Sequence, residues 1–329
     1  MEKNIQKNKK SSDGEDKMDF SKSDDSGNFE NSSRSSWINK NGVDSDVILS
    51  TRARLIRNLS DFTFPSKLSS GEKQRVDSLV HHAFSSKAEL FYVSKDQISN
   101  FGMDLLEMKH FICEKDFSSA LFHSSDDSVS CLVNNRDHIR LAVFGSGLCC
   151  EDLVQTVYEY DSFLQKKLKF AANKDFGYLS SNIKDSGSGL KISFRIFIPS
   201  IIFSGKFGDV ISLVQNQKFC LRHIFKIYDE SQVTFSNCIF DLYTGFSFCG
   251  SELDQMASIL SAAQNILNTE RKIRTKFADN NSTVVLNFFK QNYAKAMYSM
   301  LLTYEDGVNA ICAVKWALSH KLIKGISDS

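Results

Sequence analysis

The sequence predicts an α+β fold, and three observations along its 329 residues support that prediction. Two short apolar segments, Val129–Val133 and Ile139–Phe144, flank a polar turn, which is typical of two antiparallel neighbouring strands. Residues 151–170 repeat apolar side chains at the spacing of an amphipathic helix. From Asn280 onward the pattern is helical throughout. We therefore expect a large mixed domain followed by a smaller helical region.

Composition narrows the class of protein. Hydrophobic residues make up 42% of the chain, as in a globular protein. The formal net charge is +1, so no global field favours a nucleic acid or a membrane as partner. The apolar runs are far shorter than a bilayer span and the start does not resemble a signal peptide, so we expect a cytoplasmic location. The eight cysteines show no CxxC spacing and are expected to be buried free thiols.

Residues 1–36 consist mainly of Lys, Asp, Ser, Asn and Gly, with almost no apolar side chains. Such a segment cannot bury enough surface to offset the entropy of ordering it. We expect a disordered tail, and a solvated tail is favoured over a partner-binding one. Order is expected to begin near Trp37.

An arginine-rich segment follows a short apolar strand at Asp46–Leu49. Side chains two residues apart in an extended chain point to the same face, which places Arg52 and Arg54 side by side, with Arg57 just beyond. Two adjacent guanidinium groups repel each other unless an anion lies between them, and the planar fork of Arg suits a phosphate. Surface ion pairs would explain the same pattern, so both interpretations stay open.

The remaining elements are predicted from periodicity and turn residues. Helices are expected at Gly71–Phe84, Glu151–Phe170, Val210–Val214, Glu252–Lys276, Val284–Leu302 and Ala310–Leu322. Further strands are expected at Leu190–Ile198, Lys218–Ile227 and Ile239–Phe248. Acidic residues begin the helix at 151–170 and lysines end it, which matches the helix dipole. The polar segment 229–236 is expected to be a mobile loop over the site.

Two polar segments are candidates for a site. Cys131–Arg140 starts as an apolar strand and ends in polar residues that cannot all be buried without partners. The loop before residue 190 contains Gly187 and Gly189. It is either a flexible connection or a place where backbone N–H groups approach a phosphate, and a short GxG pattern alone does not decide between them.

Six blocks of the chain stand out as a set. Ser50–Asn58 is similar to Ser-Ser-Arg-x-Arg-x-x-Arg-Asn, and Asn134–Arg140 to Asn-Glu-Glu-Asp-His-x-Arg. Gly177–Lys191 is similar to Gly-Tyr-Leu-Thr-x-Cys-Pro-x-Asn-x-Gly-Thr-Gly-Leu-Arg. The other three blocks are Lys109–Ile112, Ile239–Glu252 and Leu318–Ile326. In order and spacing, across residues 37–326, they resemble the ATP:guanido phosphotransferase family, and within it the bacterial protein-arginine kinases.

The resemblance implies a catalytic domain at residues 37–278, built on a mostly antiparallel sheet flanked by helices. It implies a helical C-terminal region at residues 279–329, truncated before the family's phosphoarginine-sensing tail. Members of the family transfer the γ-phosphoryl group of ATP, bound with Mg²⁺, to a guanidinium. That chemistry needs cations around the phosphates, carboxylates that hold the guanidinium and take its proton, and a loop that excludes water.

On the phosphate side, most of the family's pattern is retained. The positions that match its nucleotide-binding residues are Arg52, Arg54, His110, Arg140, Lys191 and Lys226. The family has Arg at the last two of these positions. Lys keeps the charge but loses the bidentate geometry, so we expect ATP binding that is weaker than the family's.

On the acceptor side, the catalytic residues differ. The family's pair of glutamates falls on Asn135 and Arg136, and its reactive cysteine falls on Asn182. The second glutamate is the expected general base, and a cation there would repel a guanidinium substrate. Losing a general base alone typically costs about 100- to 10,000-fold in rate. The acidic residues that could replace the pair are Asp137, Asp185, Asp229 and Glu230.

Three hypotheses follow. The chain is an active protein-arginine kinase with a replacement carboxylate, or a pseudokinase that binds nucleotide or acts as a scaffold in protein quality control, or a structural protein that has lost both sites. The retained arginines and the lost acidic pair favour the pseudokinase. The partners that the resemblance implies are a protein substrate or scaffold partner, a small adaptor protein and a Clp-type ATPase, and it leaves a homodimer open.

Overall fold

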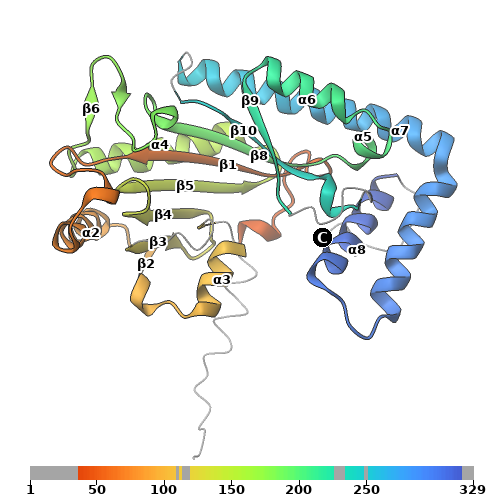
Figure 1. The fold of residues 1–329 in the computed structure, drawn as a ribbon, viewed down its shortest axis with the longest axis horizontal. Helices are drawn as coiled ribbons and strands as arrows, with labels where there is room; N and C mark the ends of the chain where they lie inside the picture. Colours follow the sequence, from red (N-terminus) through yellow and green to blue (C-terminus); the bar gives the residue numbers. More distant parts are fainter. Residues whose placement is uncertain (1–35, 109–110, 113–118, 226–233, 248–250, 321–329) are drawn as a thin grey trace, which may run out of the picture.

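A single large sheet forms the centre of the molecule in the computed structural model, which describes residues 36–108, 111–112, 119–225, 234–247 and 251–320 (Figure 1). Every neighbouring pair of its strands is antiparallel. In spatial order the strands are β2 (Leu90–Ser94), β3 (Ala120–Ser124), β4 (Val129–Val133), β5 (Ile139–Ser146), β1 (Ile48–Arg57), β8 (Leu190–Phe197), β10 (Ile239–Thr244) and β9 (Phe219–His223). A separate small hairpin joins β6 (Ala172–Asn173) to β7 (Gly177–Tyr178).

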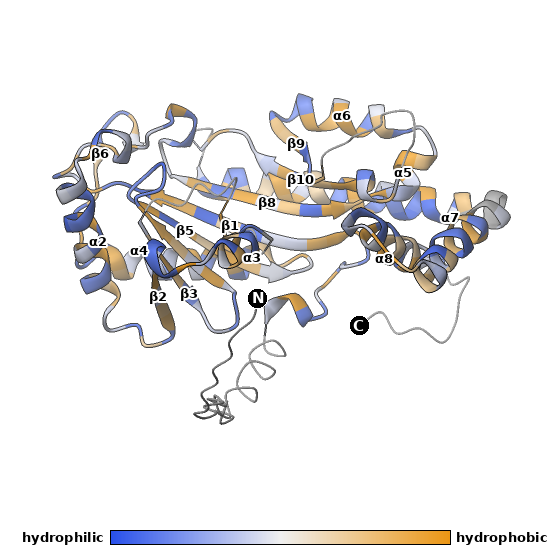
Figure 2. Ribbon diagram, turned by 60° about the horizontal axis from the view of Figure 1, so that its bottom comes forward, coloured by the Kyte–Doolittle hydropathy of each residue, from blue (hydrophilic) through white to orange (hydrophobic). Residues whose placement is uncertain are grey.

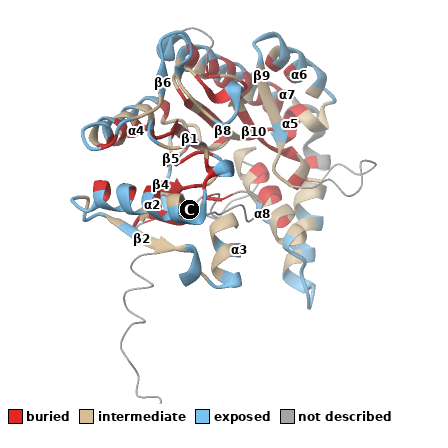
Figure 3. Cartoon of the chain, turned by 60° about the vertical axis from the view of Figure 1, so that its left-hand side comes forward, coloured by how far each residue is buried: buried red, intermediate tan, exposed pale blue. Residues whose placement is uncertain are grey.

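Helices lie against both the sheet and one another, so the predicted α+β class, with a mostly antiparallel sheet flanked by helices, is confirmed. The helices are α2 (Ser70–Phe84), α3 (Asn100–Met108), α4 (Cys150–Gln165), α5 (Pro199–Phe203), α6 (Phe207–Asn216), α7 (Glu252–Tyr298) and α8 (Tyr304–Ser319). Figure 3 shows buried residues gathered in the central strands and on the helix sides that face them. In the described part of the chain, no helix is long and apolar enough to cross a membrane.

Hydrophobic and hydrophilic residues both occur along the central strands (Figure 2). Because side chains alternate along a strand, the two faces of the sheet differ. On one face, apolar side chains such as Leu55 and Phe194 join α4 and α7 in the main hydrophobic core. Burying one such side chain stabilises the fold by about 1.5–3 kcal/mol. The opposite face of the same strands carries Arg52, Arg54 and Lys191. A register shift of one residue would bury these cations, so the apolar face also determines where they lie.

Several predicted bounds need correction. The helix predicted at residues 151–170 ends at Gln165, so the lysines expected in its last turn lie beyond it. Lys167 instead donates a hydrogen bond from Nζ to the carbonyl oxygen of Ala83, at 2.7 Å. The strand predicted at residues 239–248 ends at Thr244, where the chain turns at Gly245. The predicted helices at 252–276 and 284–302 form the continuous helix α7, which ends at residue 298.

Helix α7 contributes to two hydrophobic clusters. Its N-terminal half packs on the sheet through residues such as Ile259 and Ile266. Further along, Val285 packs with Trp316 of α8 in a second cluster that also includes Phe197 at the end of β8. The boundary predicted between residues 278 and 279 falls inside this helix, and the division into two domains stays a prediction.

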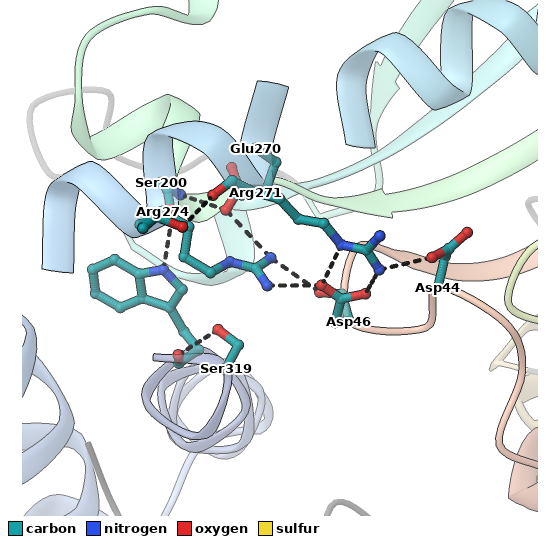
Figure 4. A network of polar contacts seen from close by, with 9 residues as sticks. Asp44, Asp46, Ser200, Glu270, Arg271, Arg274 and Ser319 are labelled. Atoms are coloured by element: carbon teal, nitrogen blue, oxygen red, sulfur yellow. Dashed lines mark hydrogen bonds and ion pairs between the residues drawn. The ribbon is translucent and has the colours of Figure 1, made fainter. Parts of the chain in front are cut away.

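An ion-pair network connects the start of β1 with α7 (Figure 4). The carboxylate of Asp46 accepts hydrogen bonds from Arg271 Nε at 3.1 Å and from Arg274 Nη1 at 2.7 Å. Arg271 Nη2 also donates to Asp44, at 2.7 Å. These two arginines therefore have carboxylate partners on the segment that enters β1.

The same network continues from α7 into α5 and α8 (Figure 4). Glu270 is fully buried and accepts hydrogen bonds from the backbone N–H groups of Ser200 and Ile201, at 3.0 and 2.9 Å. These N–H groups belong to the first turn of α5, where no carbonyl of the helix can accept them. The indole Nε1 of Trp316 donates to Ser200 Oγ at 2.9 Å. Helix α8 is thus joined to the sheet domain by a buried hydrogen bond as well as by apolar packing.

The expectation of buried free thiols holds for four of the six cysteines that the structure describes, whereas Cys149 and Cys220 are half-buried. Six of the eight lie in the described residues, and all six are free. Those that are buried are Cys131, Cys150, Cys238 and Cys312. Burial raises the pKa of the thiol of each of these four. They remain protonated at neutral pH and act as small apolar side chains.

Candidate functional site

A small cavity opens on the sheet face that carries the cations. Its volume is about 160 Å³. The residues that line it come from five strands and are Arg52, Arg54, Arg140, Lys191, Ile192, Ser193, Arg222 and Tyr243. Five of the eight side chains are cationic, and none of these lining residues is acidic. Such a lining attracts an anion and suits the oxygen atoms of phosphate.

Strand register brings these residues together from distant parts of the sequence. Arg54 in β1 lies directly opposite Lys191 in β8. One step along the strands, Ser193 lies between Arg52 in β1 and Tyr243 in β10. Arg52 donates a hydrogen bond from Nε to Ser193 Oγ at 3.2 Å, which orients its guanidinium group. Residues two apart in one strand point to the same face, and so do residues directly opposite each other on neighbouring strands. Arg52, Arg54, Lys191, Ser193 and Tyr243 therefore share one face of the sheet.

A buried carboxylate borders the cavity on the side of β9 and β10. Asp241 is 5% exposed and accepts hydrogen bonds from Arg195 Nε at 3.2 Å and Arg222 Nη2 at 3.0 Å. Burial alone would raise the pKa of Asp241. The charges of Arg195 and Arg52, with the hydrogen bonds from Arg222 and Arg195, outweigh burial and hold that pKa below its usual range. Asp241 therefore stays ionised and orients Arg222 at the cavity edge.

Lys191 forms an ion pair with Asp185, the last residue of the short 3₁₀ helix η4 (Ile183–Asp185). Burial is the main cause that lowers the pKa of Lys191, and the neighbouring charge of Arg54 lowers it further. The hydrogen bond and charge of Asp185 act in the opposite direction. Asp185 is thus the nearest negative charge to this cationic side chain.

The turn between β4 and β5 is held to the end of β1. Asn58 donates from Nδ2 to Asp137 Oδ1 at 2.7 Å and accepts from the backbone N–H of His138 at 2.9 Å. His138 Nδ1 in turn accepts from the backbone N–H of Leu59 at 3.1 Å. Asn134 adopts a left-handed conformation, with φ of 52°, which lets the turn close in few residues. These hydrogen bonds pair buried polar groups of the turn with groups at the end of β1.

The loop from β7 to β8 is anchored to the same turn and to β1. The backbone N–H of Ser181 donates to Asp137 Oδ1 at 2.7 Å. Gly189 has φ of +69°, and a Cβ at this position would lie 2.7 Å from Ile56 O and from Arg57 Nη1. Glycine is therefore required here by both backbone conformation and space. Of the two interpretations left open for this loop, a purely flexible connection is excluded by these anchors.

A family model provides the comparison that identifies the chain. The model described as ATP:guanido phosphotransferase, C-terminal catalytic domain, matches residues 66–273. The chain belongs to this family. The family inferred from the six motif blocks is confirmed by this match and by the relatives that follow.

Curated relatives cover most of the chain. A protein-arginine kinase of Bacillus cereus (strain G9842) is 26% identical over 306 residues, which cover 90% of this chain and 85% of that protein. A protein-arginine kinase of Bacillus anthracis (strain CDC 684 / NRRL 3495) is 25% identical over the same shares. Within the guanido phosphotransferases, the chain is therefore similar to protein-arginine kinases over 90% of its length.

Solved structures show the same fold. The crystal structure of lombricine kinase superposes with a TM-score of 0.60 at 14% identity, covering 70% of this chain and 68% of that one. The duplicated taurocyamine kinase from Schistosoma mansoni with bound transition state analog components has a TM-score of 0.61 at 18% identity. That match covers 74% of this chain and 37% of the duplicated one.

The positions predicted to match the family's phosphate-binding residues lie together where the structure describes them. Arg52, Arg54, Arg140 and Lys191 line one cavity. The other two predicted positions, His110 and Lys226, lie outside the described residues. The same holds for Asp229 and Glu230, and for most of the loop predicted at 229–236.

The positions predicted to match the family's catalytic residues are not among those that line the cavity. Asn135 is half-buried and Arg136 is exposed, both at the tip of the turn that precedes Arg140. Asn182 is exposed and caps η4, since its Oδ1 accepts from the backbone N–H of Lys184 at 3.2 Å. Asp137, one of the proposed replacements, is 4% exposed and holds the turn and the loop together.

Four residues that line the cavity were not predicted from the sequence: Ile192, Ser193, Arg222 and Tyr243. The alternation of apolar and polar residues could have indicated two of them, because Arg222 and Tyr243 stand at positions of β9 and β10 that point away from the apolar core. The missing information was the pairing of these strands, which places Arg222 opposite Asp241 and next to Tyr243. That pairing joins segments about 20 residues apart through a loop whose length periodicity does not restrict.

The described residues fit the phosphates of a nucleotide better than a resident metal ion. Among them, no group of three or more His, Cys, Asp or Glu side chains could hold a metal ion. The cationic cavity, by contrast, offers donors for several phosphate oxygens. A Mg²⁺ ion that arrives with its nucleotide is held mainly by the phosphates and water, so it needs no cage of protein ligands.

Proposed function

We propose that this guanido phosphotransferase binds the phosphate groups of MgATP in the cavity. The observation that supports this is the set of five cations that four strands hold around one small volume: Arg52, Arg54, Arg140, Lys191 and Arg222. Arginine forks match phosphate oxygens, and each charge-assisted hydrogen bond contributes more than a neutral one. Lys191 offers a point charge where the family motif has Arg, so the affinity should be lower than a full set of arginines would provide.

We propose further that phosphoryl transfer to an arginine guanidinium is lost, which makes the chain a pseudokinase of the protein-arginine kinase type. Arg136 stands where the motif has the expected base, and it cannot accept a proton at physiological pH. The adjacent Asp137 is not a ready substitute, because it is buried and its Oδ1 already accepts hydrogen bonds from Asn58 and from the N–H of Ser181. Without a base the rate should fall about 100- to 10,000-fold.

The second candidate is an active protein-arginine kinase. Similarity to proteins of that name over 90% of the chain favours it. It needs a carboxylate that takes over from the lost pair, and Asp185 is the described candidate closest to the cavity, through its contact with Lys191. Under this second candidate function, the chain would phosphorylate a protein substrate. For either candidate function, the partners stay predictions: a scaffold partner, an adaptor protein, a Clp-type ATPase and a second copy of the chain. The cytoplasmic location also stays a prediction.

The test is incorporation of labelled γ-phosphate from MgATP into an arginine-rich acceptor protein, with products kept at neutral to basic pH because phosphoarginine is acid-labile. We expect nucleotide binding without transfer. Asn135→Glu combined with Arg136→Glu should restore transfer if only the acidic pair is missing. Robust transfer by the natural chain, abolished by Arg52→Ala, would contradict the pseudokinase and support the second candidate.

A further inference from the structure

The ion pair between Asp185 and Lys191 lies within a site made of cations. Lys191 lines the cavity, and its side chain is 14% exposed. The side chain of Asp185 is 12% exposed. Exposed ion pairs have little effect because water screens them, but this pair is mostly removed from water. A full negative charge therefore borders the volume that the surrounding cations prepare for an anion.

The loop keeps this carboxylate in place. The backbone N–H of Asp185 donates to the carbonyl oxygen of Asn182 at 2.8 Å. The loop on either side is fixed by the N–H of Ser181, which donates to Asp137 Oδ1 at 2.7 Å, and by the N–H of Ser247, which donates to Lys184 O at 2.9 Å. A carboxylate on a backbone with three such anchors stays beside Lys191 when an anion enters.

Both members of the pair depart from the motif that this loop resembles. The ninth position of Gly177–Lys191 is Asn in the motif and Asp185 here, and the last position is Arg in the motif and Lys191 here. The two changes meet in space, although six residues separate them in the chain. Together they replace an amide and a guanidinium by a carboxylate and an ammonium group, which lowers the net positive charge at this corner by one.

We propose that Asp185 is a specificity-determining residue of the cavity, one that weakens the binding of highly charged polyphosphates relative to anions of lower charge. The inference rests on the proposed anion-binding function. Coulomb energy scales with the product of the charges, so repulsion by Asp185 grows as an anion brings more negative charge near it. Asp185 also shares Lys191 with any anion that enters.

The experiment is isothermal titration of the full chain with inorganic phosphate, pyrophosphate and tripolyphosphate, and then with MgATP. Asp185→Asn keeps the shape of the side chain and removes its charge. We expect tripolyphosphate to bind about tenfold more tightly to this variant, and phosphate to gain by a smaller factor. Asp175→Asn is the matched control, because it removes the same charge from an exposed position between β6 and β7. Its affinities should equal those of the natural chain.

The folded state of each variant is checked by circular dichroism and thermal unfolding, and Asp185→Ser serves as a second uncharged variant should the Asn variant fail to fold. Unchanged or weaker tripolyphosphate binding by a folded variant would overturn the inference. Tightened tripolyphosphate binding without any MgATP binding would support the role of Asp185 and contradict the nucleotide function. If MgATP binds and no Asp185 variant alters its affinity, the proposed nucleotide function is supported and the role of Asp185 is not. If no folded protein binds any of these anions, both the nucleotide function and the role of Asp185 are overturned.

Discussion

Arginines gather at two places in this molecule, and their surroundings differ. Around the cavity, Arg52, Arg54 and Arg140 line a volume together with two further cations, and no acidic side chain lines it with them. Where α7 meets the start of β1, Arg271 and Arg274 contact carboxylates directly, at distances of 2.5 to 3.6 Å. Two of the five cavity cations, Lys191 and Arg222, also contact carboxylates that lie outside the lining, but positive charge is in excess around the cavity and favours an anion from solution. The arrangement at α7 already contains its anions and joins two parts of the fold.

The same contrast exists within a single strand. Arg57 belongs to the arginine-rich segment, but it points to the face opposite Arg52 and Arg54 and is 2% exposed. It forms a bidentate ion pair with Asp161 of α4, with N–O distances of 2.9 and 2.8 Å, and its guanidinium lies 3.6 Å from the ring centre of Tyr178. Arginine content alone therefore does not identify an anion site. The positions of the carboxylates do.

The largest effect is expected from removing the carboxylate partner of Arg57, which tests whether this arginine has a structural role. Asp161→Ala should lower the free energy of unfolding by about 3–5 kcal/mol, because it leaves a buried guanidinium without its counter-charge. Urea denaturation measures this loss. Glu159→Ala, at an exposed position of the same helix, should change stability by less than about 0.5 kcal/mol. Equal losses in the two variants would contradict a structural role for the Arg57 ion pair.

The matching change in the cavity should affect binding and leave folding nearly intact. Arg54→Ala should weaken MgATP binding about 10- to 100-fold, since one charge-assisted hydrogen bond contributes about 1.5–3 kcal/mol. Isothermal titration measures the affinity, and thermal unfolding measures the fold. Arg75→Ala removes the same kind of side chain from an exposed position of α2 and should bind MgATP as the natural chain does. Identical affinities for all three proteins would show that the cavity is not the nucleotide site.

A smaller effect is expected in the network that holds α8. Ser200→Ala removes the acceptor of the Trp316 indole N–H, and an unsatisfied buried donor costs about 1–3 kcal/mol. Stability in urea should fall by that amount, while MgATP affinity stays unchanged. Ser204→Ala is the control, because its hydroxyl bonds only a carbonyl of its own turn, at 3.0 Å, and should cost less. A loss of MgATP affinity in Ser200→Ala would show that the two regions are coupled.

The smallest expected effect is a pH dependence at Asp46. Burial alone would raise its pKa, but the hydrogen bonds and charges of Arg271 and Arg274 outweigh burial and lower it from the ordinary 3.8. A carboxyl with a lowered folded-state pKa contributes stability above its unfolded pKa and loses it as the pH falls through the folded value. Asp46→Asn should therefore be less stable than the natural chain near neutral pH.

The difference between the two proteins should shrink as the pH falls below 3.8, the ordinary value for Asp46. Midpoints of thermal unfolding across a series of acidic buffers measure it. Asp175→Asn, at an exposed position, should show no such trend. A difference that stays constant down to the most acidic buffer would mean that the charge of Asp46 is not what Arg271 and Arg274 require.

Local patterns predicted several elements closely, and the failures have a common cause. The strand at 129–133 is observed with the same bounds, and the helix at 71–84 begins one residue earlier, after the capping box of Ser69 and Glu72. The helix at 151–170 was predicted too long because Leu168 continues the apolar stripe, although it is buried from a non-helical segment beyond Gln165. Apolar spacing records which side chains are buried, and several backbone paths bury the same ones.

The candidate site likewise contains residues that local patterns predicted and residues that they did not. Alternation placed Arg52 and Arg54 on one face, and motif spacing added Arg140 and Lys191, all of which the structure brings to one cavity. Neither signal found Arg222, whose place depends on the pairing of β9 with β10. Neither showed that Asp185 contacts Lys191, because that contact depends on the path of an anchored loop.

By itself, the sequence determined the family and the period-two separation of cations from apolar side chains, and it predicts where catalytic carboxylates are replaced. These properties depend on residue type and on spacing within a few residues, and both can be read directly from the sequence. Only the tertiary structure decided which charges meet: Arg57 with Asp161, Arg271 and Arg274 with Asp46, and Lys191 with Asp185. Charge pairing depends on distances of a few ångströms between segments far apart in the chain, and strand register and loop anchors set those distances.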